Sequence, residues 1–340
     1  MAANNAWMEL TVGGRMLVDG GCLVALMLEE ELNTAALVTL EIELQQATRS
    51  LISTLQMGTA MVLELGEGDA TLRSLDFTLV ELQHRMTVEG WRLTARGVDK
   101  LVTLKHRRQT RVWEVSASAV VQELAGNHGL SAQLQGVAPT TEVLVQNNLS
   151  SAEMLARLAR QYNYVGQLDG STLLYGRNID STSVTVDLSD GVRDLEIHQS
   201  MLGIPTKVEV WGYDWKQQQA AVQGTATAAD LQSFSAGATG SALVQKTYGE
   251  VKLLVESNEP LTPGDARELA VGLLQQRTER FLEGSLSCDG EPSARPGRSL
   301  TLTGFEDLNG SYRIRATRHE LRGADPYRTF IEFFSDGQPS

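Results

Sequence analysis

The sequence predicts a mixed, mainly β protein with two similar antiparallel β-barrel domains and an intervening small α/β domain. Three observations predict this class. Short segments that alternate apolar and polar residues, separated by glycines, fill about the first hundred residues. Capped helices and short strands follow, and a helix with glycine-punctuated strands completes the chain. We place the three domains at residues 1–103, 104–190 and 191–340.

The first domain is expected to be a closed or nearly closed barrel. Residues 38–44 alternate between apolar and polar side chains, which is the period of a half-buried strand. Gly58 and Gly66 bracket an apolar run and mark turns on either side of it. The expected strands are Met8–Val12, Cys22–Leu28, Val38–Leu44, Met61–Leu65, Phe77–Leu82 and Met86–Ala95. Short strands with such turns are typical of an antiparallel barrel.

The middle domain carries the clearest helix boundaries. Ser116 is expected to cap a helix that ends near Asn127. A second helix begins with Ser150 and Glu153, the spacing of a capping box, and continues with apolar residues at helical intervals. Short strands joined by an Asp-Gly turn are expected at Tyr164–Leu168 and Thr172–Tyr175. The combination predicts a small α/β unit.

The third domain is expected to begin with strands near Leu195 and at Lys207–Tyr213. Residues 216–249 are rich in small and polar side chains and poor in large apolar ones. Such composition predicts a long flexible loop, or an arm that becomes ordered on a partner.

A helix is then expected at residues 263–283. Thr262 is its N-cap, Pro263 occupies its first position, and Gly284 marks its end. The strands expected after this helix are Ser285–Cys288, Ser299–Thr303, Tyr312–Leu321 and Tyr327–Phe334. They complete the second predicted barrel.

The two β domains are expected to be copies of one another. Phe77 precedes His84 by the same number of residues as Tyr312 precedes His319, and each pair is preceded by a glycine and an apolar strand. The structural positions that this repeat and its turns single out are Gly58, Phe77, His84, Trp91, Gly297, Gly310, Tyr312, His319 and Tyr327.

Catalytic motifs are missing from the sequence. It contains no nucleophile elbow, no phosphate-binding loop and no zinc-protease motif, and its histidines lack metal-ligand spacing. We therefore expect no catalytic residue, no metal and no cofactor. A hydrolase that uses two carboxylates stays open, since their separation is a three-dimensional property. A sugar-binding surface at Trp211 and Trp215 also stays open.

Composition limits the partners. The chain has 340 residues and a formal net charge of −13, which disfavours stable binding to nucleic acid. One basic cluster, residues 105–108 with Arg111, is too small for a nucleic-acid footprint. No segment has the uninterrupted apolar length of a membrane helix. Cys22 and Cys288 are expected to be free buried thiols.

Three segments together resemble a known family. They are "WRLTARGVDKLVTL" at 91–104, "NNLSSAEMLARLARQYNYVGQLDGSTLLYGR" at 147–177, and the end of the chain from Gly264, which contains "PGRSLTLTGFEDLNGSYRIRATRHELRGADPYRTFIEF". They resemble the baseplate hub proteins of contractile tails and contractile injection systems. These are the phage late control gene D family and the hub part of the VgrG proteins of type VI secretion.

The resemblance implies two tail-tube-like barrels and a structural, non-enzymatic function. Three copies would form a pseudo-six-fold homotrimeric ring that joins the hexameric tail tube to a trimeric spike. Because the chain stops after the last barrel strand, where VgrG proteins continue into a spike, we expect the spike to be a separate protein. Other baseplate proteins and the tape measure are further expected partners. The protein would be made in the bacterial cytoplasm and assembled into the baseplate as a virion component. The alternatives are a β-rich cell-wall hydrolase of a tail tip and a carbohydrate-binding β module.

Overall fold

A computed structural model gives the architecture of the chain. It describes residues 5–16, 22–45, 47, 49–88, 90–137, 143–214, 219–323 and 325–339. Strands account for 50% of the structure and helices for 20%, which confirms the predicted mainly β class.

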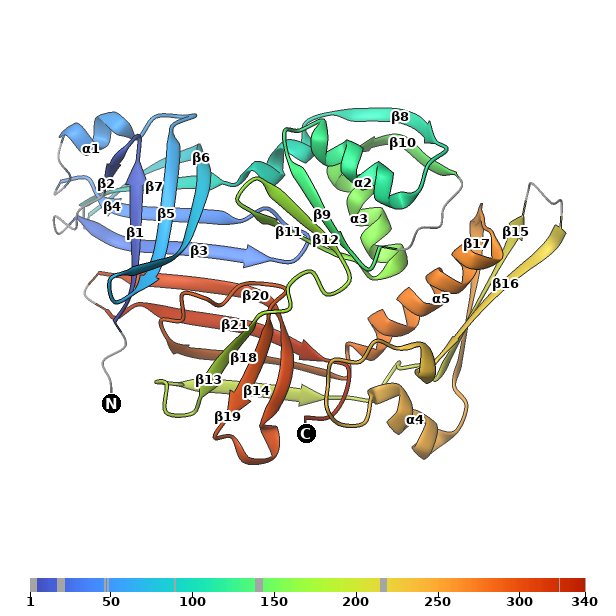
Figure 1. Ribbon diagram of the computed structural model, residues 1–340. Coiled ribbons are helices and arrows are strands. Elements are labelled where there is room, and N and C mark those ends of the chain that lie inside the picture. The colour runs from blue at the N-terminus through green and yellow to red at the C-terminus, as the bar shows by residue number, and fades with distance from the viewer. Residues whose placement is uncertain are drawn as a thin grey trace.

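One large sheet contains most of the strands (Figure 1). Its strand order is β14-β18-β21-β20-β3-β4-β7-β6-β5-β1-β2, with β19 beside β20 and β13 beside β19. The strands are β1 (Ala6–Val12), β2 (Arg15–Met16), β3 (Leu23–Glu31), β4 (Leu37–Glu43), β5 (Ala60–Glu67), β6 (Ala70–Thr87), β7 (Gly90–Val98), β13 (Ser183–Asp187), β14 (Asp194–Gln199), β18 (Leu282–Asp289), β19 (Ser299–Thr303), β20 (Gly310–Arg322) and β21 (Arg328–Ser335). The path is open at both ends within the described residues, so the pairing does not form two separate closed barrels.

The sheet unites two β units that are far apart in sequence. The first unit contains β1 to β7, and the second contains β13, β14 and β18 to β21. They join where residues 25–31 of β3 pair antiparallel with residues 316–322 of β20. We call this pairing the seam. The second unit begins at β13, which lies before the boundary expected at residue 190.

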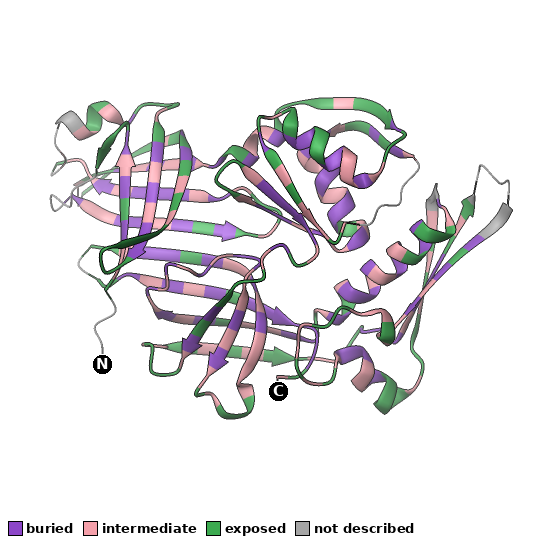
Figure 2. Cartoon of the chain, in the orientation of Figure 1, coloured by how far each residue is buried: buried purple, intermediate pink, exposed green. Residues whose placement is uncertain are grey.

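Each β unit has its own core. Alternate residues of the strands are buried, as the stripes of Figure 2 show. The first core includes Leu10, Leu28, Leu40, Met61 and Leu63. The second includes Leu282, Leu300, Tyr312, Ile331 and Phe333. The opposite face of the strands is left for polar side chains.

The α/β unit contains the expected helices. They are α2 (Ala117–Gly126), capped by Ser116, and α3 (Ser151–Tyr162), whose Ser150 and Glu153 form the predicted capping box. The small strands are β8 (Arg108–Trp113), β9 (Ser131–Gln135), β10 (Leu144–Ser150), β11 (Val165–Asp169) and β12 (Thr172–Gly176). The remaining short helices are α1 (Arg49–Thr54), η1 (Lys100–Lys105), η2 (Ala228–Asp230) and η3 (Glu306–Leu308).

The segment expected to be a long loop is largely regular structure. Residues 216–249 contain β16 (Gln219–Thr227), then η2 and α4 (Gly240–Tyr248). The sparse apolar residues suffice because Val222 and Ala226 of β16 pack on α5 (Pro263–Thr278). Residues 216–218 lie outside the described part of the chain.

The strand at Lys207–Tyr213 does not belong to the second β unit, contrary to the expected domain division. It is part of β15 (Lys207–Asp214), which pairs with β16 and with β17 (Lys252–Pro260) in a separate sheet. Val208 and Val210 share one core with helices α2, α3 and α5. This sheet and α5 therefore extend the α/β unit and interrupt the second β unit (Figure 1).

The helix expected at residues 263–283 ends earlier. Thr262 and Pro263 begin α5 as predicted, but Glu279 is its C-cap and Phe281 is already buried in the second β core. Gly284 lies inside β18, where a Cβ atom would come within 2.6 Å of the Phe333 ring. The glycine therefore makes room for a core aromatic side chain and does not stop the helix.

Gly224 fixes how closely β16 approaches α5. A Cβ atom at this position would lie 2.1 Å from the carbonyl carbon of Ala266 and 2.3 Å from the backbone nitrogen of Arg267. We expect Gly224→Ala to lower the free energy of unfolding by about 2–3 kcal/mol, because backbone cannot move aside as a side chain can. Urea unfolding measures the change. Gly126→Ala is the matched control, since a Cβ atom there meets nothing within 4 Å. Equal stability of the two variants would contradict this account.

Candidate assembly surfaces

The repeat positions lie in similar places in the two β units. Gly58 and Gly297 precede β5 and β19 with φ angles of 85° and 87°, the left-handed region that favours glycine. Phe77 on β6 faces Met61 on β5. Tyr312 on β20 faces Leu300 on β19. Gly310, expected in a turn, is the first residue of β20.

Each unit also contains a β-bulge at the corresponding point. In the first, the pairing of β6 with β7 skips Val80, between Leu79 and Glu81. In the second, the pairing of β20 with β21 skips Arg315. Each bulge follows its aromatic residue, Phe77 or Tyr312, by three positions. Beyond the bulge, β6 continues to Thr87, so the strands expected at Phe77–Leu82 and Met86–Ala95 are instead one long β6 and a separate β7.

The two units differ in what covers the second half of the long strand. His84 is exposed on β6, whereas His319 of β20 is fully buried. Trp91 is 50% exposed, whereas Tyr327 is 6% exposed. The difference arises because β3 pairs with β20 along the seam, while no described strand covers the corresponding edge of β6.

Hydrogen bonds hold His319 within the second unit. Its Nε2 lies 3.1 Å from the carbonyl oxygen of Ala294 and therefore carries the proton, since a carbonyl only accepts. Its Nδ1 accepts from the Tyr327 hydroxyl at 2.7 Å and lies 3.2 Å from Thr329 Oγ1. Burial disfavours the imidazolium and lowers the pKa of His319 to about 4.

A buried ion pair lies beside the seam. Glu30 on β3 accepts a hydrogen bond from Arg73 on β6 at 2.7 Å, and both side chains are nearly inaccessible to solvent. Arg73 also donates to the carbonyl oxygen of Ala294 at 3.0 Å. Thr317 and Gln167 each approach the Glu30 carboxylate within 3.5 Å. Burial acts to raise the pKa of Glu30, but the charge and hydrogen bond of Arg73 hold it below its ordinary value.

These contacts join the first β unit, the second β unit and the α/β unit at one point. A sequence pattern would not reveal them, because Glu30 is simply the middle residue of a run of three glutamates. Its partner Arg73 lies on a different strand, and both Thr317 and Gln167 are distant along the chain. The only local indication is an alternating strand in which Glu30 falls on the core-facing side.

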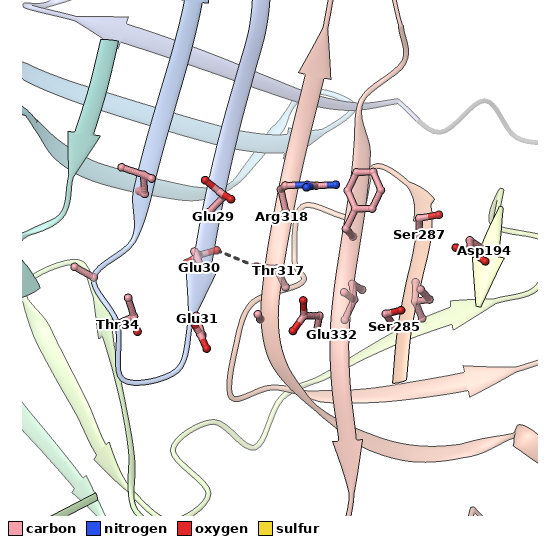
Figure 3. A pocket seen from close by; sticks show the side chains of 16 residues that line it. Glu29, Glu30, Glu31, Thr34, Asp194, Ser285, Ser287, Thr317, Arg318 and Glu332 are labelled. Carbon is pink, nitrogen blue, oxygen red and sulfur yellow. Dashed lines mark hydrogen bonds between the residues drawn. The ribbon is translucent and has the colours of Figure 1, made fainter. Parts of the chain in front are cut away.

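A polar concavity of about 690 Å³ lies over β3, β20, β21 and β18 (Figure 3). Its charged side chains are Glu29, Glu30, Glu31, Asp194, Arg318 and Glu332, with Ser285 and Ser287 beside them. The guanidinium of Arg318 lies 4.1 Å from the centre of the Phe330 ring. Carboxylates outnumber cations, so this face of the sheet is acidic.

No group of three or more histidine, cysteine or acidic residues could hold a metal ion within the described residues. Trp211 is 37% exposed on the outer face of β15, and Trp215 lies outside the described residues. In the basic cluster, Arg108 forms an ion pair with Glu153, and Arg111 with Glu123. No helix in the described part of the chain combines the length and the apolarity needed to cross a membrane.

Comparison with a family model identifies the chain. The model described as the Alg8 N-terminal domain matches residues 30–323. The chain belongs to the Alg8 N-terminal domain family. No curated protein sequence matches the chain.

Solved structures share its fold over nearly the whole chain. The prophage MuSo2 43 kDa tail protein of Shewanella oneidensis is 12% identical with a TM-score of 0.71, over 96% of this chain and 98% of that one. The tail protein of Neisseria meningitidis MC58 is 12% identical with a TM-score of 0.69, over 98% of both chains.

A third structure comes from a secretion system. The Escherichia coli c3393 protein is described as a type VI secretion component that resembles the T4 bacteriophage tail proteins gp27 and gp5. It is 10% identical with a TM-score of 0.60, over 97% of this chain and 79% of that one. The resemblance of the chain to phage tail proteins and to VgrG-related type VI secretion proteins is therefore confirmed at the level of the fold.

Proposed function

We propose that this chain is a structural baseplate protein, the hub of a contractile tail or contractile injection system, without enzymatic activity. The observation that carries the proposal is a fold shared with phage tail proteins over 96–98% of the chain. The two similar β units, joined in one open sheet, support it, because a free strand edge is a template for pairing with another chain.

The repeat gives this hub its geometric function. Three copies would present six similar β units, which can contact a hexameric tail tube on one side. Differences between the two units, such as exposed His84 against buried His319, leave the ring three-fold and suited to a trimeric spike. Tube protein, spike protein, other baseplate proteins and the tape measure are the partners of this assembly.

The acidic concavity suits a channel through which a polyanion passes. Glu29, Glu31 and Glu332 lie on the polar face of the sheet, and the whole chain carries a charge of −13. If this face lines the lumen of the ring, negatively charged cargo is repelled from the wall and does not bind it.

The solution mass tests the proposal. Light scattering is expected to give about three times the 37.0 kDa chain mass, alone or in a 3:3 complex with the candidate spike protein. A chain that stays monomeric and ignores both spike and tube proteins would overturn the hub function.

A murein-hydrolysis assay tests the non-enzymatic part. We expect no release of soluble fragments from purified cell wall above that of a buffer blank. Release that depends on a carboxylate of the concavity, such as Glu332, would instead favour the hydrolase reading.

A further inference from the structure

Several strand edges of the large sheet have no partner strand within the described residues, and two of them belong to β6 and β14. Residues 80–87 of β6 pair with β7 on one side only, after β5 has left the other side at Thr78. β14 pairs with β18 on one side only. Both edges consist of six to eight residues that are mostly exposed, which makes them templates for a further strand.

The repeat shows what these edges correspond to. β20 is the counterpart of β6, because each continues past a bulge after leaving its first partner. β14 is the counterpart of β3. In the second unit β18 lies between β14 and β21, and in the first unit β4 lies in the same way between β3 and β7. Within one chain, β20 and β3 pair in the seam. The free edge of β6 therefore corresponds to the edge of β20 in the seam, and the free edge of β14 corresponds to the edge of β3 in the seam.

The register of the seam can be transferred to these edges. Leu26 faces Leu40 on β4, which faces Ala95 on β7. Leu195 faces Leu286 on β18, which faces Ile331 on β21. Ala95 in turn faces Leu82 on β6, and Ile331 faces Thr317 on β20. Leu82 lies five residues after Phe77, and Thr317 lies five residues after Tyr312. Leu195 therefore corresponds to Leu26, and Met86 corresponds to Leu321, its partner in the seam.

We propose that β14 of one copy pairs antiparallel with residues 80–87 of β6 in the next copy, so that Met86 faces Leu195 and Arg85 faces Glu196. The inference rests on the proposed hub function and gives its ring a specific interface between copies. The contact is heterologous, because each copy offers β6 on one side and β14 on the other. Such contacts give a ring when the rotation between copies closes, as the proposed trimer requires.

The side chains brought together by this register are complementary. Met86 is 76% exposed and would lie against Leu195, as Leu321 lies against Leu26 in the seam. Arg85 faces Arg92 across the β6–β7 hairpin, and Glu196 would place a carboxylate beside these two positive charges. His84 would face Ile197, as buried His319 faces Leu28.

Exposure on the two free edges supports a covering strand. In β6 every residue from Glu81 to Thr87 except Leu82 is exposed, whereas the seam residues Thr317, His319 and Glu320 are buried. The neighbouring side chains Val88 and Trp91 are exposed as well. A strand on β6 would remove these apolar groups from water.

Disulfide trapping tests the register. A mixture of a Met86→Cys variant and a Leu195→Cys variant, oxidised mildly, is expected to give covalent dimers of twice the chain mass. Directly opposite residues of antiparallel strands have Cα atoms about 4.5–5.5 Å apart, within disulfide range. Cys22 and Cys288 are buried and should not interfere. Neither variant alone should give the dimer.

The matched control mixes Met86→Cys with Glu196→Cys, whose side chain points to the other face of the sheet. Trapping in the first mixture and not in the second supports the register. Equal trapping in both, or none in either while both variants keep the wild-type circular dichroism spectrum, overturns it.

Charge exchange provides a second measurement. Arg85→Glu or Glu196→Arg alone is expected to weaken self-association, measured by sedimentation equilibrium, at least tenfold, and the double variant to recover it. Arg160→Glu, an exposed change of the same charge on α3, should have no effect. A wild-type trimer that neither charge variant weakens overturns this interface but leaves the hub function standing. If the disulfide-linked dimers form but light scattering does not give three times the chain mass, the interface stands and the trimeric hub is rejected.

Discussion

Replacing Arg73 with methionine is expected to lower the free energy of unfolding by about 3–5 kcal/mol, the usual cost of removing one partner from a buried ion pair. The change leaves the Glu30 carboxylate buried beside the seam without its cation. It also removes the hydrogen bond that Arg73 donates to the Ala294 carbonyl. Urea unfolding followed by circular dichroism measures the loss.

Two further variants separate the buried charge from general damage. Arg73→Met combined with Glu30→Gln should recover much of the loss, because no unpaired carboxylate is left. Arg96→Ala removes an arginine from an ion pair with Glu81 in which both side chains are about a third exposed or more, and should cost about 1 kcal/mol or less. A double variant as unstable as Arg73→Met would show that packing, and not charge, dominates at this site.

Stability is expected to depend on the protonation of His319 in weak acid. Its pKa is about 4 in the folded chain against an ordinary 6.5, so the unfolded chain binds the proton more readily. The folded chain therefore has its full stability with respect to this group above pH 6.5, where His319 is neutral in both states. This contribution to the free energy of unfolding is lost as the pH falls from 6.5 through 4. The loss is about 3 kcal/mol over this range, since each pKa unit corresponds to about 1.4 kcal/mol.

His319→Gln should flatten this part of the profile, because the amide still donates to the Ala294 carbonyl but does not titrate. His84→Gln, at the exposed counterpart, is the matched control and should keep the wild-type slope. Burial raises the pKa of Asp99 to about 6 and acts in the opposite direction over the same range. Because Asp99 is present in every variant, comparing slopes isolates His319. Identical slopes for all three proteins would contradict the prediction.

Local features of the fold were readable from the sequence. Alternation at residues 38–44 predicted the strand that became β4, and Ser150 with Glu153 predicted the start of α3. These features depend on neighbours along the chain, whose period and capping chemistry act within a few residues. The spacing of Phe77 and His84 likewise reflects a strand and its bulge, which are local.

The errors concern distant partners. Nothing near Val208 indicates that its strand packs with α5 on the α/β unit, and not with the second β unit. Phe281 was assigned to a helix because helical and extended backbones both suit the residues before it, and the second β core decides between them. Glu30 acquires its significance from Arg73, a partner that no periodicity identifies. The open sheet was missed because strand order is set by pairing between segments hundreds of residues apart.

The seam also has a consequence for synthesis on the ribosome. β3 is made long before the strand that covers its edge, residues 316–322 of β20. Until then the nascent chain carries an exposed β edge while almost three hundred further residues are translated. Pairing between such distant segments is slow and leaves intermediates prone to aggregation. Synthesis of β20 should therefore be the step that allows the sheet to form, and chains cut short before β20 should accumulate in inclusion bodies or with chaperones.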